Sequence, residues 1–92
     1  MIHFEWDNIK NSSNRKKHGV WFEEATQVFD DKSALMYYDK DHSDSEDRFI
    51  MLGRSASNIL VVVYCERHKS NIRLISARKA TQKEVKQYEK GI

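Results

Sequence analysis

The sequence predicts an α+β domain in which an antiparallel β-sheet meander is backed by N-terminal helices and followed by a C-terminal helix. Three observations lead to this fold class. Residues 7–29 carry helix-type signals, residues 33–79 alternate as strands do, and the last dozen residues begin with a helix-capping pattern. At 92 residues the chain suffices for one domain with a single core, and we assign residues 1–92 to it.

The N-terminal part is expected to contain one short strand and two helices. Residues 3–6 favour the strand, and Asp7 is placed to cap a helix that runs to about His18. This helix is polar, with Ile9 as its one clear apolar residue, so we expect it to be weakly anchored. Residues 21–29 space their apolar side chains along one helical face and predict the second helix.

The remainder of the chain is expected to form four strands and the last helix. The predicted strands are residues 33–39, 48–55, 58–67 and 71–79, with the polar segment 39–47 as a loop. The segment 58–67 is the most apolar and is expected to be buried on both faces. Thr81 followed by Glu84 is a capping-box pattern that begins a helix ending near Lys90.

A trial strand register divides the polar side chains of the meander into two groups. With turns at residues 55–58 and 68–71, Glu46, Arg48 and Arg67 lie at one end of the sheet, and Arg54 and Arg78 lie at the other. The ends are about 20 Å apart at ~3.3 Å per strand residue. No single phosphate spans that distance, whereas a strand of RNA several nucleotides long does.

The same register predicts which cations have acidic neighbours. It places Arg67 opposite Ile72 and near Glu46. It also makes Glu66 and Arg73 neighbours across the hairpin, so ion pairs are expected at both places. Arg78, opposite Val61, is left without an acidic partner, which makes it the leading candidate for a functional cation.

Charge is distributed unevenly along the chain. Residues 1–47 contain six basic and eleven acidic side chains, whereas residues 48–92 contain ten basic and three acidic ones. A cationic half on a small domain attracts polyanions. The single Cys65 excludes an internal disulfide, no apolar run approaches the ~20 residues of a membrane span, and no secretion signal is visible. We therefore expect a cytoplasmic protein without membrane contacts.

Metal and cofactor motifs are not recognisable. The four histidines lack the spacing of metal ligands, and the acidic segment 39–47 lacks the glycine and the final glutamate of an EF-hand loop. We predict no cofactor and no metal site. A metal-dependent nuclease remains as a minor alternative, and its ligands would be Asp39, Asp41, His42 and Asp44.

Several motifs in collinear order resemble the BrnT family of bacterial toxins. They are FEWD, KHGV-x-FEEA-x-x-VF-D, DHS-x-x-EDRFI-x-x-G-x-S, VVV-x-x-ER and IRLISARKAT-x-x-E-x-x-x-Y, and they span residues 4–88. The resemblance implies a RelE-like fold and a ribonuclease toxin that inhibits translation by cleaving RNA. It also implies that a BrnA-type antitoxin neutralises the toxin and that the two proteins form a heterotetramer. The ribbon-helix-helix domain of the antitoxin would bind operator DNA.

Two departures from the family pattern are visible. Trp21 stands before FEEA where a small capping residue is common, so the second helix would start loosely or Trp21 would pack on a partner. Tyr64 and Cys65 stand where His-Thr is expected, which argues against a catalytic role for that pair.

Metal-independent RNA cleavage requires a base for the 2′-hydroxyl, stabilisation of the phosphorane and an acid for the leaving 5′-oxygen. We assign phosphate and transition-state roles to Arg78, Arg67 and Arg48. Glu46 and Glu66 are candidate bases, and His18 and His42 are each a candidate acid or base. Lys17, Arg54 and Tyr88 are expected to bind the substrate. The alternative function is a non-catalytic basic module that binds an antitoxin or RNA.

Overall fold

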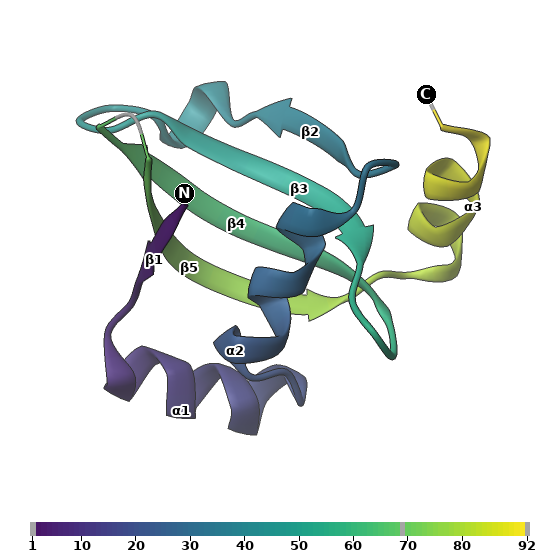
Figure 1. The fold of residues 1–92 in the computed structure, drawn as a ribbon, viewed down its shortest axis with the longest axis horizontal. Helices are drawn as coiled ribbons and strands as arrows, with labels where there is room; N and C mark the ends of the chain where they lie inside the picture. Colours follow the sequence, from purple (N-terminus) through teal and green to yellow (C-terminus); the bar gives the residue numbers. More distant parts are fainter. Residues whose placement is uncertain (1, 69, 92) are drawn as a thin grey trace.

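A computed structural model describes residues 2–68 and 70–91 and confirms the α+β class. Five strands form one sheet in the order β1-β5-β4-β3-β2, with helices at one face and at one end (Figure 1). The strands are β1 (His3–Glu5), β2 (Leu35–Tyr38), β3 (Arg48–Arg54), β4 (Ile59–Arg67) and β5 (Asn71–Lys79). The helices are α1 (Asn8–His18), α2 (Phe22–Ala25) and α3 (Gln82–Lys90), with 3-10 turns η1 (Thr26–Asp30) and η2 (Lys40–His42).

The meander is antiparallel from β2 through β5, as predicted, and β1 adds a parallel pairing with β5. The predicted pairing of β3 with β4 is confirmed at both ends. Arg48 lies opposite Cys65, and Arg54 lies opposite Ile59. Between β4 and β5, Val61 lies opposite Arg78 as expected. The two groups of arginines therefore lie at opposite ends of the sheet.

A β-bulge corrects the rest of the β4–β5 register. Val63 pairs with Ser76 but Tyr64 pairs with Leu74, so β5 contains one extra residue at this point. Beyond the bulge Arg67 pairs with Asn71, and the predicted pairing with Ile72 is wrong.

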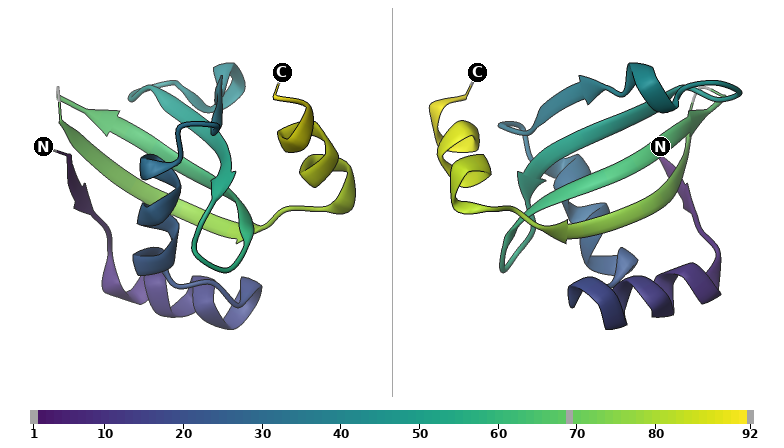
Figure 2. Two further views of the ribbon diagram at one scale, coloured as in Figure 1. Left: turned by 45° about the vertical axis from the view of Figure 1, so that its right-hand side comes forward. Right: turned by 180° about the vertical axis from the view of Figure 1, so that it is seen from behind.

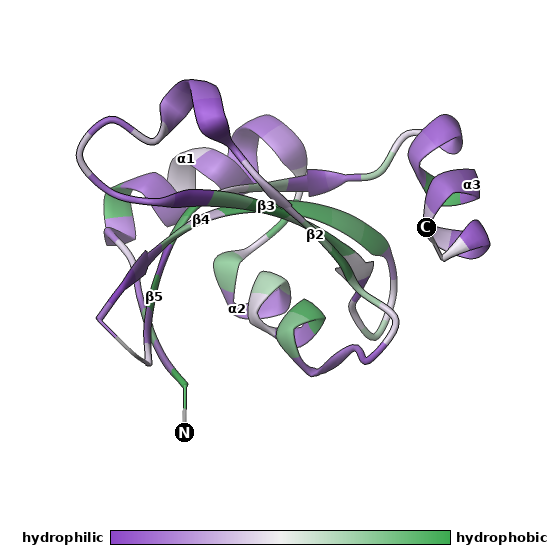
Figure 3. Cartoon of the chain, turned by 90° about the horizontal axis from the view of Figure 1, so that it is seen from above, coloured by the Kyte–Doolittle hydropathy of each residue, from purple (hydrophilic) through white to green (hydrophobic). Residues whose placement is uncertain are grey.

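The two faces of the sheet differ in what covers them. The main core lies between the sheet and the segment comprising α1, α2 and η1, and its fully buried large side chains are Phe22, Leu60, Leu74, Val20, Val28 and Val62. The opposite face is open over much of its area, as Figure 2 shows from behind. A smaller apolar cluster on that face contains Leu52, Val61 and Tyr88 where α3 approaches. Figure 3 shows α2 and the central strands as the hydrophobic elements, whereas α3 and the segment before β3 are mostly hydrophilic.

Helix α1 is anchored by amide side chains rather than by apolar ones. Ile9 is 78% exposed, whereas Asn11 and Asn14 are each only 6% exposed. Asn14 Nδ2 donates to the carbonyl oxygens of Val20 and Ala77 at 2.8 Å, and its Oδ1 accepts from the Ala77 N–H at 3.1 Å. The expectation of a weakly anchored helix is therefore wrong, because hydrogen bonds replace the missing apolar face.

The second predicted helix is divided into α2 and the 3-10 turn η1. Trp21 at its N-cap position makes no side-chain cap, in agreement with its lack of an oxygen acceptor. The start is nevertheless fixed, because the Phe22 N–H donates to Asn11 Oδ1 at 2.8 Å. The side chain that caps this helix thus comes from the preceding helix.

Helix α3 begins with the predicted capping box, in which Thr81 and Glu84 bond each other's backbone N–H groups. It ends at Gly91, whose φ of 74° lies in the left-handed region that glycine adopts without strain. Among the helices of residues 2–68 and 70–91, none has the length and apolar character needed to cross a membrane.

Candidate functional site

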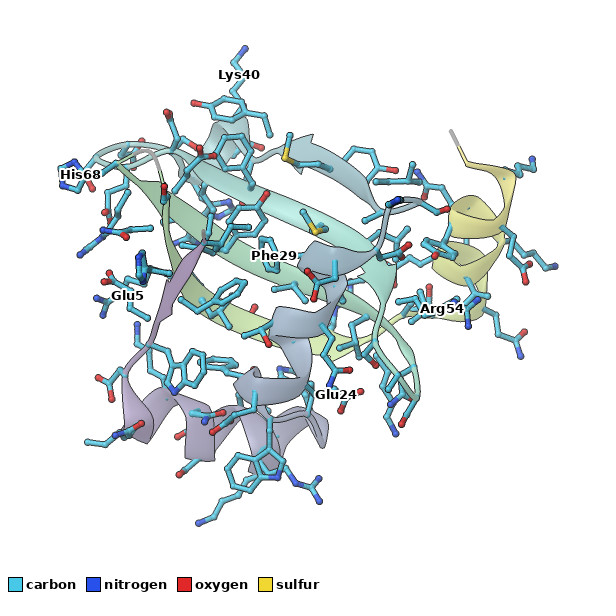
Figure 4. All side chains as sticks on the ribbon, in the orientation of Figure 1. Glu5, Glu24, Phe29, Lys40, Arg54 and His68 are labelled. Carbon is cyan, nitrogen blue, oxygen red and sulfur yellow. The ribbon has the colours of Figure 1, made fainter. Side chains whose placement is uncertain are left out.

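A polar hollow lies at the end of the sheet farthest from α3. We call it the Arg48 hollow; it has a volume of about 270 Å³ and is lined by His42, Asp44, Ser45, Glu46, Arg48 and Cys65. A neighbouring outer hollow shares Ser45 and Glu46 with it and adds Asp47, Glu66, Arg67 and His68. Figure 4 shows Glu5 and His68 at this end of the sheet and Arg54 at the other, beside α3.

Arg48 has unused hydrogen-bonding capacity in this hollow. Its Nε is buried, and no hydrogen-bond partner for it exists among the described residues. Leaving a buried donor unsatisfied costs about 1–3 kcal/mol, and more for a charged group. An anion bound in the hollow would supply the missing acceptor.

Arg67 holds the carboxylate of Glu46 in place. Arg67 Nε donates to Glu46 Oε2 at 2.5 Å, and Nη2 approaches Glu46 Oε1 at 3.4 Å. Glu46 raises the pKa of Arg67 through this hydrogen bond and through its charge, so the guanidinium stays cationic. Arg67 Nη1 also donates to Glu5 on β1 at 3.3 Å. The predicted Glu46–Arg67 ion pair is therefore confirmed.

His42 is oriented by a neighbouring carboxylate. Its Nδ1 lies 3.1 Å from both carboxylate oxygens of Asp39, an arrangement in which Nδ1–H donates. This leaves Nε2 as the ring nitrogen that can exchange a proton with a ligand. The structure thus brings three predicted residues, Glu46, Arg48 and Arg67, together with the alternative histidine, His42.

Arg78 has an acidic partner, contrary to the prediction. Its Nη1 and Nη2 donate to the two oxygens of Glu84 at 2.8 and 2.9 Å. Glu84 belongs to the first turn of α3, which the strand register did not include. This pair lies at the other end of the sheet from the Arg48 hollow. In the structure Arg78 therefore ties α3 to the end of β5.

The Arg78–Glu84 pair predicts a pH-dependent contribution to stability. The hydrogen bonds from Arg78 are the largest cause that lowers the pKa of Glu84, from 4.5 to about 2. Glu84→Gln keeps an acceptor for the Thr81 N–H but removes the charge. We expect a loss of about 0.5–1 kcal/mol in unfolding free energy at pH 7, because the pair is partly solvated.

The pH range follows from the lowered pKa. The contribution of Glu84 is complete above 4.5 and is lost as the pH falls towards 2, so the variant and the wild type should converge in acid. Denaturant-induced unfolding between pH 7 and pH 2 would measure the free energy of unfolding of both proteins. Glu89→Gln, on the exposed side of α3, is the control. A constant difference across that range would contradict the assignment.

Arg54 and Tyr88 contact each other at the end of the sheet beside α3. The Arg54 guanidinium lies 5.7 Å from the centre of the Tyr88 ring. The Tyr88 hydroxyl donates to Asp31 Oδ2 at 2.6 Å, and this bond raises the pKa of the phenol. Tyr88 is 9% exposed and belongs to the smaller apolar cluster, a position that does not favour its expected role in binding the substrate.

Lys17 and His18 lie in a different place from the Arg48 hollow. They line a second hollow of about 250 Å³ between α1 and β5, together with Lys10, Ser13, Asn14, Ile75 and Ser76. We call it the α1–β5 hollow. His18 is therefore not among the side chains that line the Arg48 hollow, although it was named as a candidate acid or base.

The residues at the end of β4 divide between the two faces. Tyr64 is only 2% exposed and packs in the main core, and burial followed by the charge of Glu66 raises its pKa to about 12. Cys65 lines the Arg48 hollow instead. The structure thus separates the pair that departs from the family pattern.

Arg73 is a residue whose position the sequence reasoning missed. It lies opposite Cys65, on the other side of β4 from Arg48. Its acidic neighbour is Glu5 at 4.0 Å rather than the predicted Glu66. The β-bulge moved it, and no turn or glycine signal in β5 indicated that bulge. The pairing of His42 with Asp39 was also missed, although their spacing of three residues in a polar turn was a usable signal.

The acidic segment before β3 does not gather ligands for a metal. Within residues 2–68 and 70–91, no group of three or more histidine, cysteine, aspartate or glutamate side chains is placed to hold a metal ion. Asp39 and His42 instead bond each other, as described above.

Comparison with known proteins identifies a family and a related fold. Residues 6–84 match the family model described as "Ribonuclease toxin, BrnT, of type II toxin-antitoxin system". The crystal structure of the Brucella abortus ribonuclease toxin BrnT superimposes with a TM-score of 0.68 at 22% identity, covering 89% of this chain and 100% of that one. At this identity the superposition shows a shared fold. No curated protein sequence matched the chain.

Proposed function

Because this chain belongs to the BrnT family of ribonuclease toxins of type II toxin–antitoxin systems, we propose that it is a metal-independent endoribonuclease whose catalytic centre is the Arg48 hollow. Its substrate is cellular RNA, and its cleavage inhibits translation. One observation supports this location above others. Among the described residues, the buried Nε of Arg48 has no acceptor, and the hollow around it also contains a carboxylate and an oriented imidazole.

The proposed reaction is an internal transfer at phosphorus. The 2′-oxygen of the substrate bonds to the adjacent phosphorus as its proton passes to the Glu46 carboxylate. The bond from phosphorus to the 5′-oxygen then breaks, and the leaving oxygen takes a proton from His42 Nε2. The products are a 2′,3′-cyclic phosphate and a free 5′-hydroxyl, so protons and electrons balance.

The arginines stabilise the charge that develops on the phosphorane. Arg48 donates from Nε to a non-bridging oxygen, and this bond strengthens as negative charge accumulates there. Arg67 holds the Glu46 carboxylate in place at the hollow, and Asp39 orients the His42 ring. Arg73, across Cys65 from Arg48, adds positive potential.

A type II toxin has an antitoxin partner, which the family membership implies for this chain. We propose that this partner is a BrnA-type protein with a ribbon-helix-helix domain and that the two form a heterotetramer. Operator DNA would then be contacted through the antitoxin. Co-expression with such a protein should abolish growth arrest, and the mass of the purified complex should equal two copies of each chain.

Independence from metal ions is the direct test of the proposed chemistry. Purified protein should cleave single-stranded RNA at the same rate with and without EDTA, because side chains supply every proton transfer. The 3′ product ends should carry 2′,3′-cyclic phosphate, detectable by mass spectrometry. Loss of cleavage in EDTA with recovery on adding Mg²⁺ or Mn²⁺ would refute the mechanism. Salt-sensitive binding without any cleavage would favour a non-catalytic module.

A further inference from the structure

The Arg48 hollow is poorly suited to attract RNA on its own. Asp44 and Glu46 line it together with Arg48, so its carboxylates outnumber its guanidinium. The Arg67 guanidinium nearby is already occupied by Glu46. Affinity for nucleic acid depends mainly on cations that neutralise backbone phosphates. A substrate strand therefore needs a second, more cationic place on this molecule.

The α1–β5 hollow has the required charge. Its lining contains Lys10, Lys17 and His18, and no carboxylate is present among the described residues that line it. Two hydroxyl groups, from Ser13 and Ser76, lie in the same lining and can donate to phosphate oxygens. The set therefore resembles a phosphate-backbone contact surface in both charge and hydrogen-bonding groups.

The hollow is also held in a fixed shape. Asn14 lies at its base, and its amide bonds both the N–H and the carbonyl oxygen of Ala77 on β5. These bonds fix the distance between α1, which carries the lysines, and β5, which carries Ser76. Helix α1 lies below β5 in the view of Figure 1, and Asn14 bonds β5 beyond the residues that pair with β1. The cations are thus presented by two elements locked to each other.

A continuous path joins this hollow to the Arg48 hollow. Ser76 lies opposite Val63, which lies opposite Ile50, and Arg48 is two residues farther along β3. Two strand spacings and two strand residues give a separation of about 12 Å. The path crosses the open face of the sheet, which α1 and α2 leave uncovered (Figure 2).

We infer that the α1–β5 hollow is a phosphate-binding subsite for single-stranded RNA, which holds the backbone a few nucleotides from the phosphate at Arg48. The inference rests on the proposed function, because it concerns the same RNA substrate. Lys10 and Lys17 act as point charges, and His18 and the two serines add hydrogen bonds. His18 thereby has a binding role, away from the reacting atoms.

The test measures binding of a non-cleavable RNA, so that catalysis does not enter the readout. A fluorescent 2′-O-methyl oligonucleotide of about eight residues is titrated against the purified protein at several salt concentrations. Each lost phosphate contact should reduce the slope of log K against log salt by ~0.7. Lys10→Gln and Lys17→Gln should each show that reduction, and the double variant about twice as much.

Lys16→Gln is the matched control. It removes the same charge from the same helix, but Lys16 lines a neighbouring hollow with Asn8, Ile9, Ser12 and Ser13, which shares only Ser13 with the α1–β5 hollow. Equal slopes for Lys16→Gln and the wild type, with lower slopes for the other two variants, support the subsite. Equal reductions in all three variants, no reduction in any, or no binding by the wild type would overturn it. Wild-type cleavage alongside unchanged slopes would overturn the subsite and leave the proposed ribonuclease function standing.

Discussion

Replacing Arg48 with alanine is expected to lower the rate of RNA cleavage about 100- to 1,000-fold, the usual effect of removing one donor that stabilises a transition-state oxyanion. The fold should persist, since the Nε of Arg48 makes no hydrogen bond among the described residues. Binding of non-cleavable RNA should change much less than cleavage, because the interaction strengthens mainly in the transition state. Initial rates with a fluorogenic RNA, at equal folded fraction by circular dichroism, would measure the effect.

Two further variants test whether cleavage depends on the Nε donor of Arg48 or only on its positive charge. Arg48→Lys retains a positive charge but lacks the Nε donor, so it should recover only part of the lost rate. Lys83→Ala, on the exposed side of α3, should cleave as the wild type does.

Arg78→Ala distinguishes the structure-based assignment from the sequence-based one. Since Glu84 occupies both Nη groups of Arg78, this variant should lose stability rather than cleavage at equal folded fraction. A loss as large as that of Arg48→Ala would instead favour Arg78 as the residue that holds the scissile phosphate.

The sequence predicted the elements better than their contacts. Strand alternation located all four strands of the meander, because side-chain period is a local property. Asp7 and the Thr81–Glu84 box located both long helices, because capping is also local. The bulge in β5 depends on how two strands fit over one core, and the sequence of β5 alone does not encode it. That one residue decides whether Ile72 or Asn71 faces Arg67.

The candidate site was predictable only in part for the same reason. Glu46, Arg48 and Arg67 were grouped correctly because Arg48 and Arg67 lie on adjacent antiparallel strands whose register follows from a short turn, and Glu46 lies two residues before β3. Arg78 was misjudged because its partner, Glu84, lies beyond the strand in a helix. The direction in which the Glu84 side chain points depends on how α3 packs. His18 was grouped with the arginines by residue type, although the placement of α1 puts it at another hollow.

Asn14 should be among the most sensitive positions for stability, although nothing in its polar sequence context suggests this. The β1 strand pairs with β5 only at residues 71–73, so the N–H and carbonyl oxygen of Ala77 have no strand partner on that side. The Asn14 amide supplies both bonds, as a neighbouring strand would, and also bonds the Val20 carbonyl. The side chain therefore closes the edge of the sheet and ties α1 to it.

Asn14→Ala is expected to lower the free energy of unfolding by about 2–4 kcal/mol, since it leaves several buried backbone groups unsatisfied at ~1–3 kcal/mol each. For a domain of this size the melting temperature should fall by about 10–25 °C. Ser12→Ala, an exposed change on the same helix, should stay within about 0.5 kcal/mol of the wild type.

Asn14→Asp separates the hydrogen bonds from the volume of the side chain. It keeps the acceptor for the Ala77 N–H and nearly the same shape, but it loses both donor bonds and buries a carboxylate 2.8 Å from two carbonyl oxygens. It should therefore be at least as unstable as Asn14→Ala at pH 7 and should recover as the carboxyl becomes protonated in acid. Denaturant-induced unfolding at pH 7 and pH 4 would measure the free energy of unfolding of each variant. If Asn14→Asp were as stable as the wild type at pH 7, packing rather than the paired amide bonds would hold α1 against the sheet.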